Sequence, residues 1–254
     1  AGSDLRLHAG HGARTRRTVD LPSAAVAAIE AIGSDPLGQF VAVAAAVAAA
    51  IHRHFGDAVV ALRTPVLADD EPASLNGTGD VPLVLPLGRG TIVRELLAAT
   101  AAAVEESYSY QDFPVAAMLR DGHGMDMSAI CRCSFASAAL HAAGSFAPSS
   151  LHLEWTPDVP SRLVIDGDAS CEPFVIDGFA ASVVTAVESL RDRAAPIGRI
   201  PRLPAAGRDR VLREWNQTDG PALSLIPVHT RVEHQAACTP DATALRFGAD
   251  AVSY

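Results

Sequence analysis

The chain has 254 residues, of which 49% are hydrophobic and 19% are charged, so it carries enough apolar material for a folded core and is not intrinsically disordered. Its 20 basic and 29 acidic residues leave a net charge of −9, which argues against a nucleic-acid groove or a surface for anionic membranes. All the basic residues are arginines, and the absence of lysine excludes Schiff-base, P-loop and lysine general-base chemistry.

The cysteines and the apolar runs bear on the compartment. Cys131, Cys133, Cys171 and Cys238 are too few and too irregularly spaced for a disulfide framework, and we expect a reduced, cytoplasmic protein. The N-terminus has no signal-peptide pattern. The longest uncharged apolar stretch, residues 37–51, is shorter than the roughly 18–20 residues that span a bilayer, so a buried helix is expected and no membrane partner.

The first third of the chain predicts two helices. Residues 21–32 form the first, which ends before Gly33. Asp35, as the cap, and Pro36, in the first turn, begin a second helix that Gly56 ends. Its last turn holds His52, Arg53 and His54, which we interpret as surface groups that oppose the helix dipole.

Strands and further helices follow in alternation. Short apolar runs bounded by turn residues predict strands at 58–62, 129–137, 151–155 and 162–165. Residues 81–87 contain two prolines and fit an edge strand or an extended loop. Helices are expected from Thr91 to about 108, from Pro114, and from Asp177 to about 191. This order predicts an α/β layered fold up to residue 195.

The character of the chain changes after residue 195. Prolines and five arginines between residues 199 and 213 are typical of a linker that lies against a surface rather than in a core. A helix at 228–237, a strand at 242–247 and a hairpin turn at 248–250 are then expected. Residues 227–254 are too few to bury a core, so we expect them to be the start of a domain that is cut at its C-terminus, poorly ordered or docked non-natively without the rest of that domain.

Motifs that carry chemistry are scarce. The histidines form no zinc-binding pattern, and Cys131 and Cys133 share a strand face but lack two further ligands, so both are interpreted as small core residues. The sequence contains no Gly-x-Ser-x-Gly elbow, no Gly-x-Gly-x-x-Gly and no P-loop. Asp166-Gly167 is interpreted as a turn, and Asp177-Gly178 as the start of a helix.

Three segments nevertheless resemble a known family. Residues 202–218, which include Leu212, Trp215, Asn216 and Thr218, are similar to the linker that follows condensation domains of non-ribosomal peptide synthetases. Residues 228–245 and 252–254 resemble the opening of the adenylation domain that comes next in those proteins. Upstream, Gln111, Asp112, Phe113 and Pro114 stand where condensation domains carry a motif usually written His/Asn-Gln-Asp-Tyr/Val-Pro-Phe-Glu.

The resemblance implies a fold and a domain order. Residues 1–195 would be the C-terminal lobe of a condensation domain, with the chloramphenicol-acetyltransferase-like fold. Residues 196–226 would be the linker, and residues 227–254 the first part of an adenylation domain. The implied partners are that adenylation domain in cis and a carrier domain whose phosphopantetheine is the family's cofactor. No cofactor, metal or catalytic residue is expected in this chain itself.

The motifs also depart from the family. Nothing matches the catalytic His-His-x-x-x-Asp-Gly motif, which belongs to the other lobe. In the Gly-x-Phe-Val-Asn-Thr-x-x-x-Arg motif, Leu83 stands at the Asn position and Gly88 at the Arg position. The Arg-Asp-x-Ser-Arg-Asn-Pro-Leu motif begins at Arg120-Asp121 and then departs, and Ala116 replaces the family's acidic residue. Such losses at the lobe interface favour a half-domain without catalysis.

The favoured function is therefore a non-catalytic platform that packs against the adenylation domain, with Trp215 as its anchor and with Asn216 and Thr218 in local turn hydrogen bonds. Burial of Trp215 within the lobe is the alternative for that residue. Two other functions stay open: the C-terminal half of an active condensation domain that forms amide bonds between carrier-bound thioesters, and a docking module for a carrier domain. The amino acid activated downstream, the peptide product and the oligomeric state have no signature in the sequence.

Overall fold

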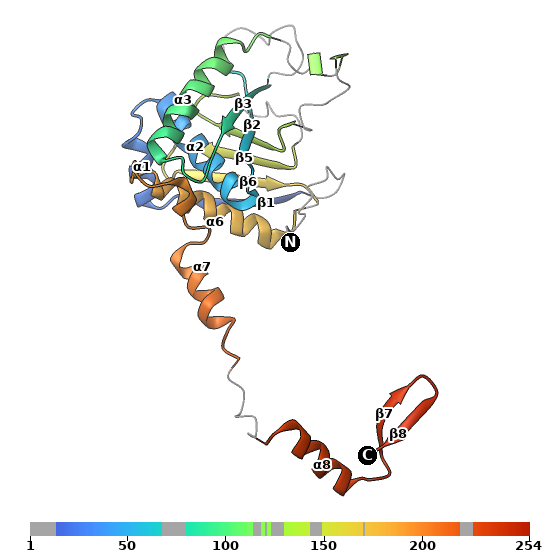
Figure 1. Ribbon diagram of the computed structural model, residues 1–254. Coiled ribbons are helices and arrows are strands. Elements are labelled where there is room, and N and C mark those ends of the chain that lie inside the picture. Colours follow the sequence, from blue (N-terminus) through green and yellow to red (C-terminus); the bar gives the residue numbers. More distant parts are fainter. Residues whose placement is uncertain are drawn as a thin grey trace. The chain divides into compact units, whose positions relative to one another are not determined.

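A computed structural model describes residues 14–67, 80–113, 118–119, 121–122, 130–142, 149–169, 171–218 and 226–254. The chain divides into two compact units, residues 1–207 and residues 208–254. Figure 1 shows their elements, and each unit is described by itself. The domain boundaries expected at residues 195 and 226 stay predictions.

The first unit is built on a six-stranded mixed sheet with the order β1-β6-β5-β4-β2-β3. The pairs β2–β4 and β4–β5 are parallel, and the other pairs are antiparallel. The strands are β1 (Thr15–Asp20), β2 (Val59–Pro65), β3 (Asp80–Pro86), β4 (Cys133–Ser137), β5 (Leu151–Thr156) and β6 (Arg162–Gly167). The α/β fold class expected from the sequence is confirmed.

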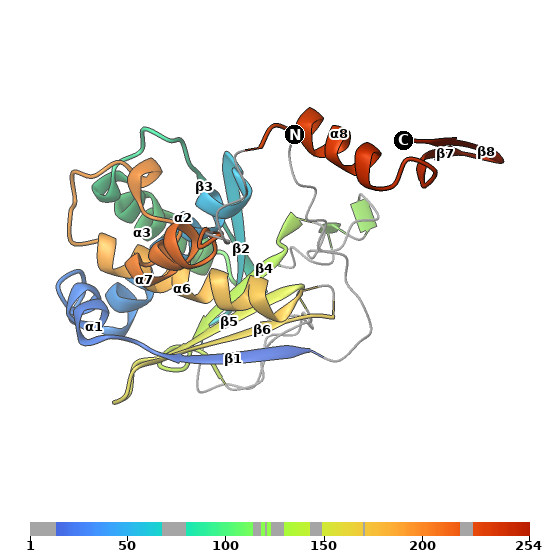
Figure 2. The same cartoon turned by 90° about the horizontal axis from the view of Figure 1, so that it is seen from below.

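Helices cover one face of this sheet, as Figure 2 shows. They are α1 (Ser23–Glu30), α2 (Pro36–Phe55), α3 (Val93–Ser109) and α6 (Pro173–Ser189). The contacts of α2 with β2, of α3 with β3 and of α6 with β1 and β6 place them there. Leucine, isoleucine and aromatic side chains from alternate strand positions meet them in a single core.

The central helix α2 begins and ends as the sequence predicts. The Asp35 carboxylate accepts a hydrogen bond from the Gly38 N–H at 2.9 Å. Gly56 follows the last turn with a φ of 78°, a left-handed conformation that glycine adopts without strain. A run of buried alanines between Ala42 and Ala50 lets the neighbouring helices approach closely.

The same helix is long and apolar enough, by length and composition alone, to cross a membrane. Of its most apolar window, 72% is buried inside the unit, and core helices pass the same test. We therefore interpret α2 as a core helix. The uncharged stretch stops at Ile51, and the helix continues through His52, Arg53 and His54 to Phe55.

The strands expected at 58–62, 151–155 and 162–165 are confirmed as β2, β5 and β6, and the strand expected at 129–137 is confirmed as β4 only from Cys133 onward. Residues 80–86 form β3 at one edge of the sheet, as the prolines predict. Strand β1 was not predicted, since Arg16, Arg17 and Asp20 break its apolar pattern. It forms because it pairs along its whole length with β6.

Two predicted helix starts are wrong. The last helix begins at Pro173, and Asp177-Gly178 lies inside it, because proline suits a first turn, which needs no N–H donor there. Helix α3 begins at Val93 rather than directly after Thr91. The Thr91 hydroxyl instead accepts a hydrogen bond from the Gly88 N–H at 3.1 Å. The helix expected from Pro114 falls largely outside the described residues.

The interpretation of His52 and His54 as surface groups is also wrong. His52 is buried, and its Nδ1 lies 2.6 Å from the carbonyl oxygen of Asp57. The His54 ring packs against Phe179 of α6 with ring centroids 5.5 Å apart. Both side chains therefore help to close the core at the end of α2.

The prediction that the chain after residue 195 lies against a surface rather than in a core is wrong for part of residues 195–207. After α6, the single turn η1 (Ile197–Arg199) places Ile197 and Ile200 in the core. The Ile197 N–H donates to the Thr91 carbonyl at 2.8 Å, which fixes this segment against the start of α3. Helix α7 (Ala205–Asp209) then leads out of the first unit.

The second unit contains the turn η2 (Arg210–Glu214), helix α8 (Val228–Cys238) and a hairpin of β7 (Thr243–Phe247) and β8 (Asp250–Ser253). The helix, the strand and the turn at Gly248, with φ of 61°, confirm the predicted elements. No residue of η2 or α8 is buried. Several large apolar side chains are exposed: Leu212, Trp215, Ile226, Val228, Val232, Leu245, Phe247 and Val252.

One close approach in the first unit yields a test of its packing. A Cβ at Gly167, the last residue of β6, would lie 2.5 Å from Cδ1 of Ile176 and 2.8 Å from Cβ of Cys171. We expect Gly167→Ala to lower the free energy of unfolding by about 1–3 kcal/mol, measured by urea denaturation. Gly178→Ala is the control: a Cβ there meets nothing within 4 Å on α6, so it should stabilise the protein slightly. Equal effects would contradict this reading of the contact.

Candidate functional site

A row of polar side chains crosses the sheet on the face opposite the four helices. Its members are register partners on successive strands: Arg63 pairs with Ser134, Ser134 with His152, His152 with Asp166, and Asp166 with Arg16. Register partners point to the same face of a sheet. The apolar core residues occupy the alternate positions and face the helices. We refer to these five residues as the polar row.

The hydrogen bonds in the middle of the polar row have a defined direction. The Ser149 hydroxyl donates its proton to the Leu151 carbonyl at 3.0 Å. In its 2.6 Å contact with Ser134 it must therefore accept, and Ser134 donates. The Ser134 oxygen is then the acceptor for Nδ1–H of His152 at 2.8 Å. A serine nucleophile needs the opposite direction, in which the imidazole accepts the hydroxyl proton.

Burial also makes this histidine a poor base. It lowers the pKa of His152 from 6.5 to about 4, although the nearby Asp166 acts to raise it. At neutral pH the ring is uncharged and already donates to Ser134. The Ser–His–Asp sequence along the row therefore resembles a catalytic triad only in composition, and its geometry serves to hold the strands together.

Ion pairs flank the row. Arg16 donates to the Asp166 carboxylate at 2.9 Å, with Arg16 largely exposed. On the other side, Arg63 lies 3.1 Å from the Asp80 carboxylate, and the two side chains are only 3% and 6% exposed. The row thus runs from an exposed ion pair at the β1 edge to a buried one that joins β2 to β3.

A second hydrogen-bonded group lies on the helix side of the sheet. The Ser137 N–H donates to Nδ1 of His141 at 3.0 Å, so the ring proton is on Nε2 and points to the Tyr108 oxygen at 2.8 Å. The Tyr108 oxygen lies 3.4 Å from the Thr64 hydroxyl. Burial lowers the pKa of His141 to about 4 and raises the pKa of Tyr108 to about 12. Neither group exchanges a proton readily at neutral pH.

The two histidines predict how stability depends on pH. Their folded-state pKa values lie below the ordinary value of 6.5, so the unfolded chain binds more protons in the range between. Stability is therefore complete above that range and falls as the pH is lowered from about 7 to about 5, by up to about 1.4 kcal/mol per pH unit for each histidine. Urea denaturation at several pH values measures this slope.

His152→Gln should make the slope shallower, because one of the two groups no longer titrates. The matched control is His229→Gln, since His229 is an exposed residue of α8 and should leave the slope unchanged. A slope that His152→Gln does not alter would show that burial of this ring does not govern the pH dependence.

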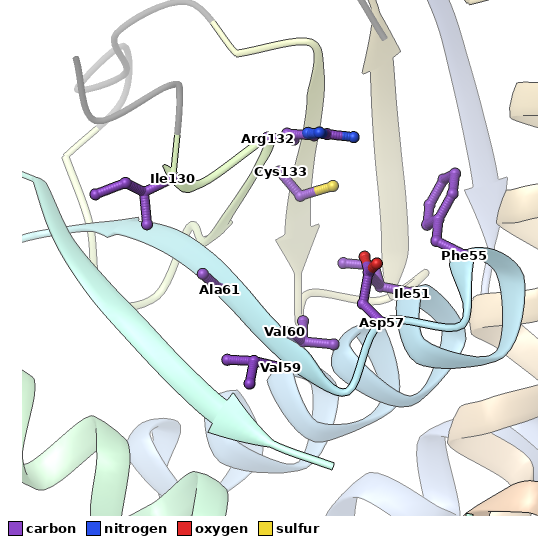
Figure 3. Close-up of a pocket in the computed structure, with 9 residues that line it drawn as sticks. All are labelled: Ile51, Phe55, Asp57, Val59, Val60, Ala61, Ile130, Arg132 and Cys133. Atoms are coloured by element: carbon purple, nitrogen blue, oxygen red, sulfur yellow. The ribbon is translucent and has the colours of Figure 1, made fainter. Parts of the chain in front are cut away.

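A pocket of about 240 Å³ lies where the end of α2, the start of β2 and the start of β4 meet. Figure 3 shows Asp57 and Arg132 among otherwise mostly apolar lining residues, with the Cys133 thiol on the same wall as Arg132. Burial raises the pKa of Cys133 to about 12, so almost none of it is thiolate at neutral pH. The pocket therefore offers no activated nucleophile.

Metal-binding geometry is absent from the part of the chain that the structure describes. There, no three histidine, cysteine or acidic side chains lie close enough together to hold an ion. Cys131, Cys133 and Cys171 are buried thiols, and Cys238 is an exposed one. The interpretation of Cys131 and Cys133 as core residues is confirmed, though only Cys133 lies within a strand.

The residues predicted at the family motif follow α3. The Gln111 side chain accepts a hydrogen bond from the Leu67 N–H at 3.2 Å, which ties the end of β2 to the end of α3. Phe113 is 54% exposed, and its N–H donates to the Tyr110 carbonyl at 2.9 Å. Asp112 is also exposed. Pro114 lies outside the described residues.

The second unit contains the predicted linker residues Leu212, Trp215, Asn216 and Thr218. The Asn216 amide donates to the carbonyls of Val211 and Leu212 at 2.9 and 3.2 Å. The Thr218 N–H donates to the Asn216 carbonyl at 2.7 Å. Trp215 and Leu212 are 68% and 54% exposed, so neither is buried within a core.

The polar row was not predicted from the sequence. Ser134, His152 and Asp166 are each a single polar residue between non-polar neighbours, a pattern that usually marks a solvated strand face. Asp166 was interpreted as part of a turn with Gly167, which is wrong, because both residues belong to β6. The signal that was available is that Ser134, His152 and Asp166 each occupy the second or fifth position of a five- or six-residue strand.

Comparison with known proteins identifies the fold. No protein-family model matches the sequence, and no curated protein matches it. Among solved structures, the first condensation domain of the calcium-dependent antibiotic synthetase, in complex with a substrate analogue, is similar with a TM-score of 0.61 and 19% identity. That match covers 76% of this chain and 48% of the other.

Two further condensation domains are similar. The one from the monacolin K polyketide synthase MokA has a TM-score of 0.59 at 14% identity, over 73% of this chain and 49% of its own. A variant of the starter condensation domain of the rhizomide synthetase RzmA has a TM-score of 0.58 at 20% identity, over 74% and 49%. The chain thus has the chloramphenicol-acetyltransferase-like fold of condensation domains and spans about half of their length.

Proposed function

We propose that this chain is a half condensation domain that does not catalyse amide-bond formation and that supports a following adenylation domain in a non-ribosomal peptide synthetase. The observation that carries the proposal is the match of about three quarters of this chain to about half of each condensation domain, while its sequence contains no His-His-x-x-x-Asp-Gly motif. In the family that motif supplies the histidine that assists the acceptor amine.

The protonation of the first unit supports a non-catalytic role. A general base works best with a pKa near the operating pH. Burial holds the pKa values of His141 and His152 near 4, and hydrogen bonds commit both rings to structural partners. Neither ring is poised to take a proton from an amine.

The second unit supports the platform role. Its exposed apolar side chains include Trp215 and Phe247, which are 68% and 87% exposed. A short helix and a hairpin with no buried core are not stable alone, so these side chains need a partner surface. We propose that this surface belongs to the rest of the adenylation domain whose first part residues 227–254 would be, and that Trp215 is its anchor.

A condensation assay tests the proposal. Donor and acceptor carrier domains, loaded with aminoacyl thioesters, are incubated with this chain and with the full-length gene product. We expect no amide product above the uncatalysed background from either. Product from this chain alone would refute the proposal, and product from the full-length protein only would favour the alternative, an active domain completed by a second half. That alternative is compatible with the half-length match.

Trp215→Ala in the full-length protein tests the anchor. Losing a large aromatic ring at a packed junction should speed proteolytic cleavage between residues 208 and 226. Phe174→Ala is the control, because Phe174 is 69% exposed on α6 of the first unit. Cleavage at the same rate in both variants would remove Trp215 as the anchor. A carrier domain as a second partner and a cytoplasmic location belong to the same proposal.

A further inference from the structure

Three arginines lie on segments that meet where the chain leaves the first unit. Arg53 lies in the last turn of α2, Arg89 in the turn after β3, and Arg202 just after η1. Arg89 and Arg202 are exposed, and Arg53 is half-buried. We refer to these three residues as the arginine cluster. The segment after α6, which carries Arg202, is coloured orange in Figure 1.

Backbone contacts hold the three segments together. The Arg53 Nε donates to the Ile200 carbonyl at 3.0 Å, two residues before Arg202. Gly198 lies against the backbone of Arg89, where an added Cβ would be 2.8 Å from the Arg89 carbonyl oxygen. Ile197 and Ile200 anchor the segment in the core. The arginine cluster is therefore built on rigid elements.

The charges of the arginine cluster are not balanced by acids. None of its members forms an ion pair with a carboxylate of the described residues, unlike Arg16, Arg17, Arg63 and Arg162. Burial, followed by repulsion from Arg202 and Arg89, lowers the pKa of Arg53. In a chain with a net charge of −9, such a concentration of positive charge has a cost that a bound anion would remove.

The His54 side chain is affected by the charges of the arginine cluster. Burial, and then the charges of Arg202 and Arg53, lower the pKa of its imidazole. Its Nε2 is buried and has no hydrogen-bond partner among the residues that the structure describes. A polar atom left unsatisfied beside guanidinium groups that form no ion pair points to a missing hydrogen-bond partner.

We propose that Arg53, Arg89 and Arg202 form a binding site for a phosphate group carried by a ligand as a phosphate ester. Guanidinium groups present planar pairs of N–H donors that match the oxygens of phosphate, and several of them can share its double charge. The site is independent of the proposed platform role, since it lies wholly in the first unit and needs no adenylation domain.

The test uses His54 as a reporter. Its imidazole is titrated by NMR with and without inorganic phosphate, at constant ionic strength held with chloride. Bound phosphate cancels the repulsion from Arg202 and Arg53, so the pKa of His54 should rise. The pKa of His141 should not change, because no arginine charge contributes to the shift of that pKa. No change at His54, or an equal change at both rings, would overturn the proposal.

Variants separate the site from general charge. Arg89→Gln and Arg202→Gln should each weaken phosphate binding about tenfold, since each removes one charged contact from an exposed position. Arg246→Gln carries the same change of net charge on β7 of the second unit and should leave the affinity within about twofold. Equal weakening in all three would mean non-specific attraction and would overturn the proposal.

Two further probes distinguish the source of the phosphate. Tighter binding of AMP than of inorganic phosphate would assign a nucleotide, and tighter binding of 4′-phosphopantetheine would assign a phosphorylated pantetheine arm. Equal binding of all three would assign a site for the phosphate group alone, and each of these outcomes supports the proposal.

Discussion

Asp80→Ala is expected to lower the free energy of unfolding by about 3–5 kcal/mol. The substitution removes the carboxylate that lies 3.1 Å from the Arg63 guanidinium while that guanidinium stays 97% covered. A buried charge that loses its opposite charge bears the cost of desolvation without the attraction that offset it. Urea denaturation followed by circular dichroism measures the effect.

Two controls isolate the burial of this pair. Arg162→Ala breaks an exposed ion pair with Asp20 of nearly the same length, 2.9 Å, and should cost no more than about 1 kcal/mol. The double substitution Arg63→Met with Asp80→Leu should cost less than Asp80→Ala alone, because no charge then remains buried. If Asp80→Ala costs as little as Arg162→Ala, burial is not what makes the pair important.

Phe40→Ala is expected to lower the free energy of unfolding by about 3–5 kcal/mol, as much as Asp80→Ala but for a different reason. Phe40 is fully buried on α2 and stacks on Phe135 of β4 with ring centroids 5.1 Å apart. It also meets the His141 ring edge-on at 5.4 Å. Removing the ring leaves a cavity between the central helix and the centre of the sheet, which thermal and urea denaturation both detect.

The control is Phe174→Ala, since Phe174 is 69% exposed in the first turn of α6. Its removal should change stability by no more than about 0.5 kcal/mol. A loss below about 1 kcal/mol for Phe40→Ala would mean that the core rearranges to fill the space. The His141 resonance is a second readout, because it should shift in Phe40→Ala and stay in place in Phe174→Ala.

Local signals account for the elements that could be predicted. Asp35 and Gly56 mark both ends of α2, and their roles depend only on neighbouring residues. The apolar runs of β2, β4, β5 and β6 are buried wherever they pair, so their strand character does not depend on the topology. The hairpin of the second unit follows from Gly248 in the same way.

What could not be predicted depends on pairing across the chain. Strand β1 has two consecutive arginines and becomes a strand only through β6, nearly 150 residues later. In the polar row, Ser134, His152 and Asp166 become neighbours only through the register of the three strands β4, β5 and β6. The arginine cluster needs Ile200 to lie against the end of α2. All of these contacts join residues that are far apart in the sequence, so no local pattern predicts them.

The family resemblance predicted the fold, but it did not predict which residues form the ion pairs and hydrogen bonds of the first unit. The motif residue Gln111 joins the end of α3 to the end of β2, and Phe113 forms a local turn with Tyr110. The residues that gather charge and hydrogen bonds, among them Arg63, Asp80 and His152, stand outside every motif that carried the resemblance.

The prolines of β3 have a consequence for association. Ser107 donates to the Pro82 carbonyl at 2.8 Å, so that carbonyl points away from β2, and alternation gives Val84 and Pro86 the same orientation. Of these three residues only Val84 has an N–H to offer. A foreign strand that approaches this margin finds almost no donors to bind, and this side of the molecule is thereby protected from fibril-like growth and from capture by another β-sheet.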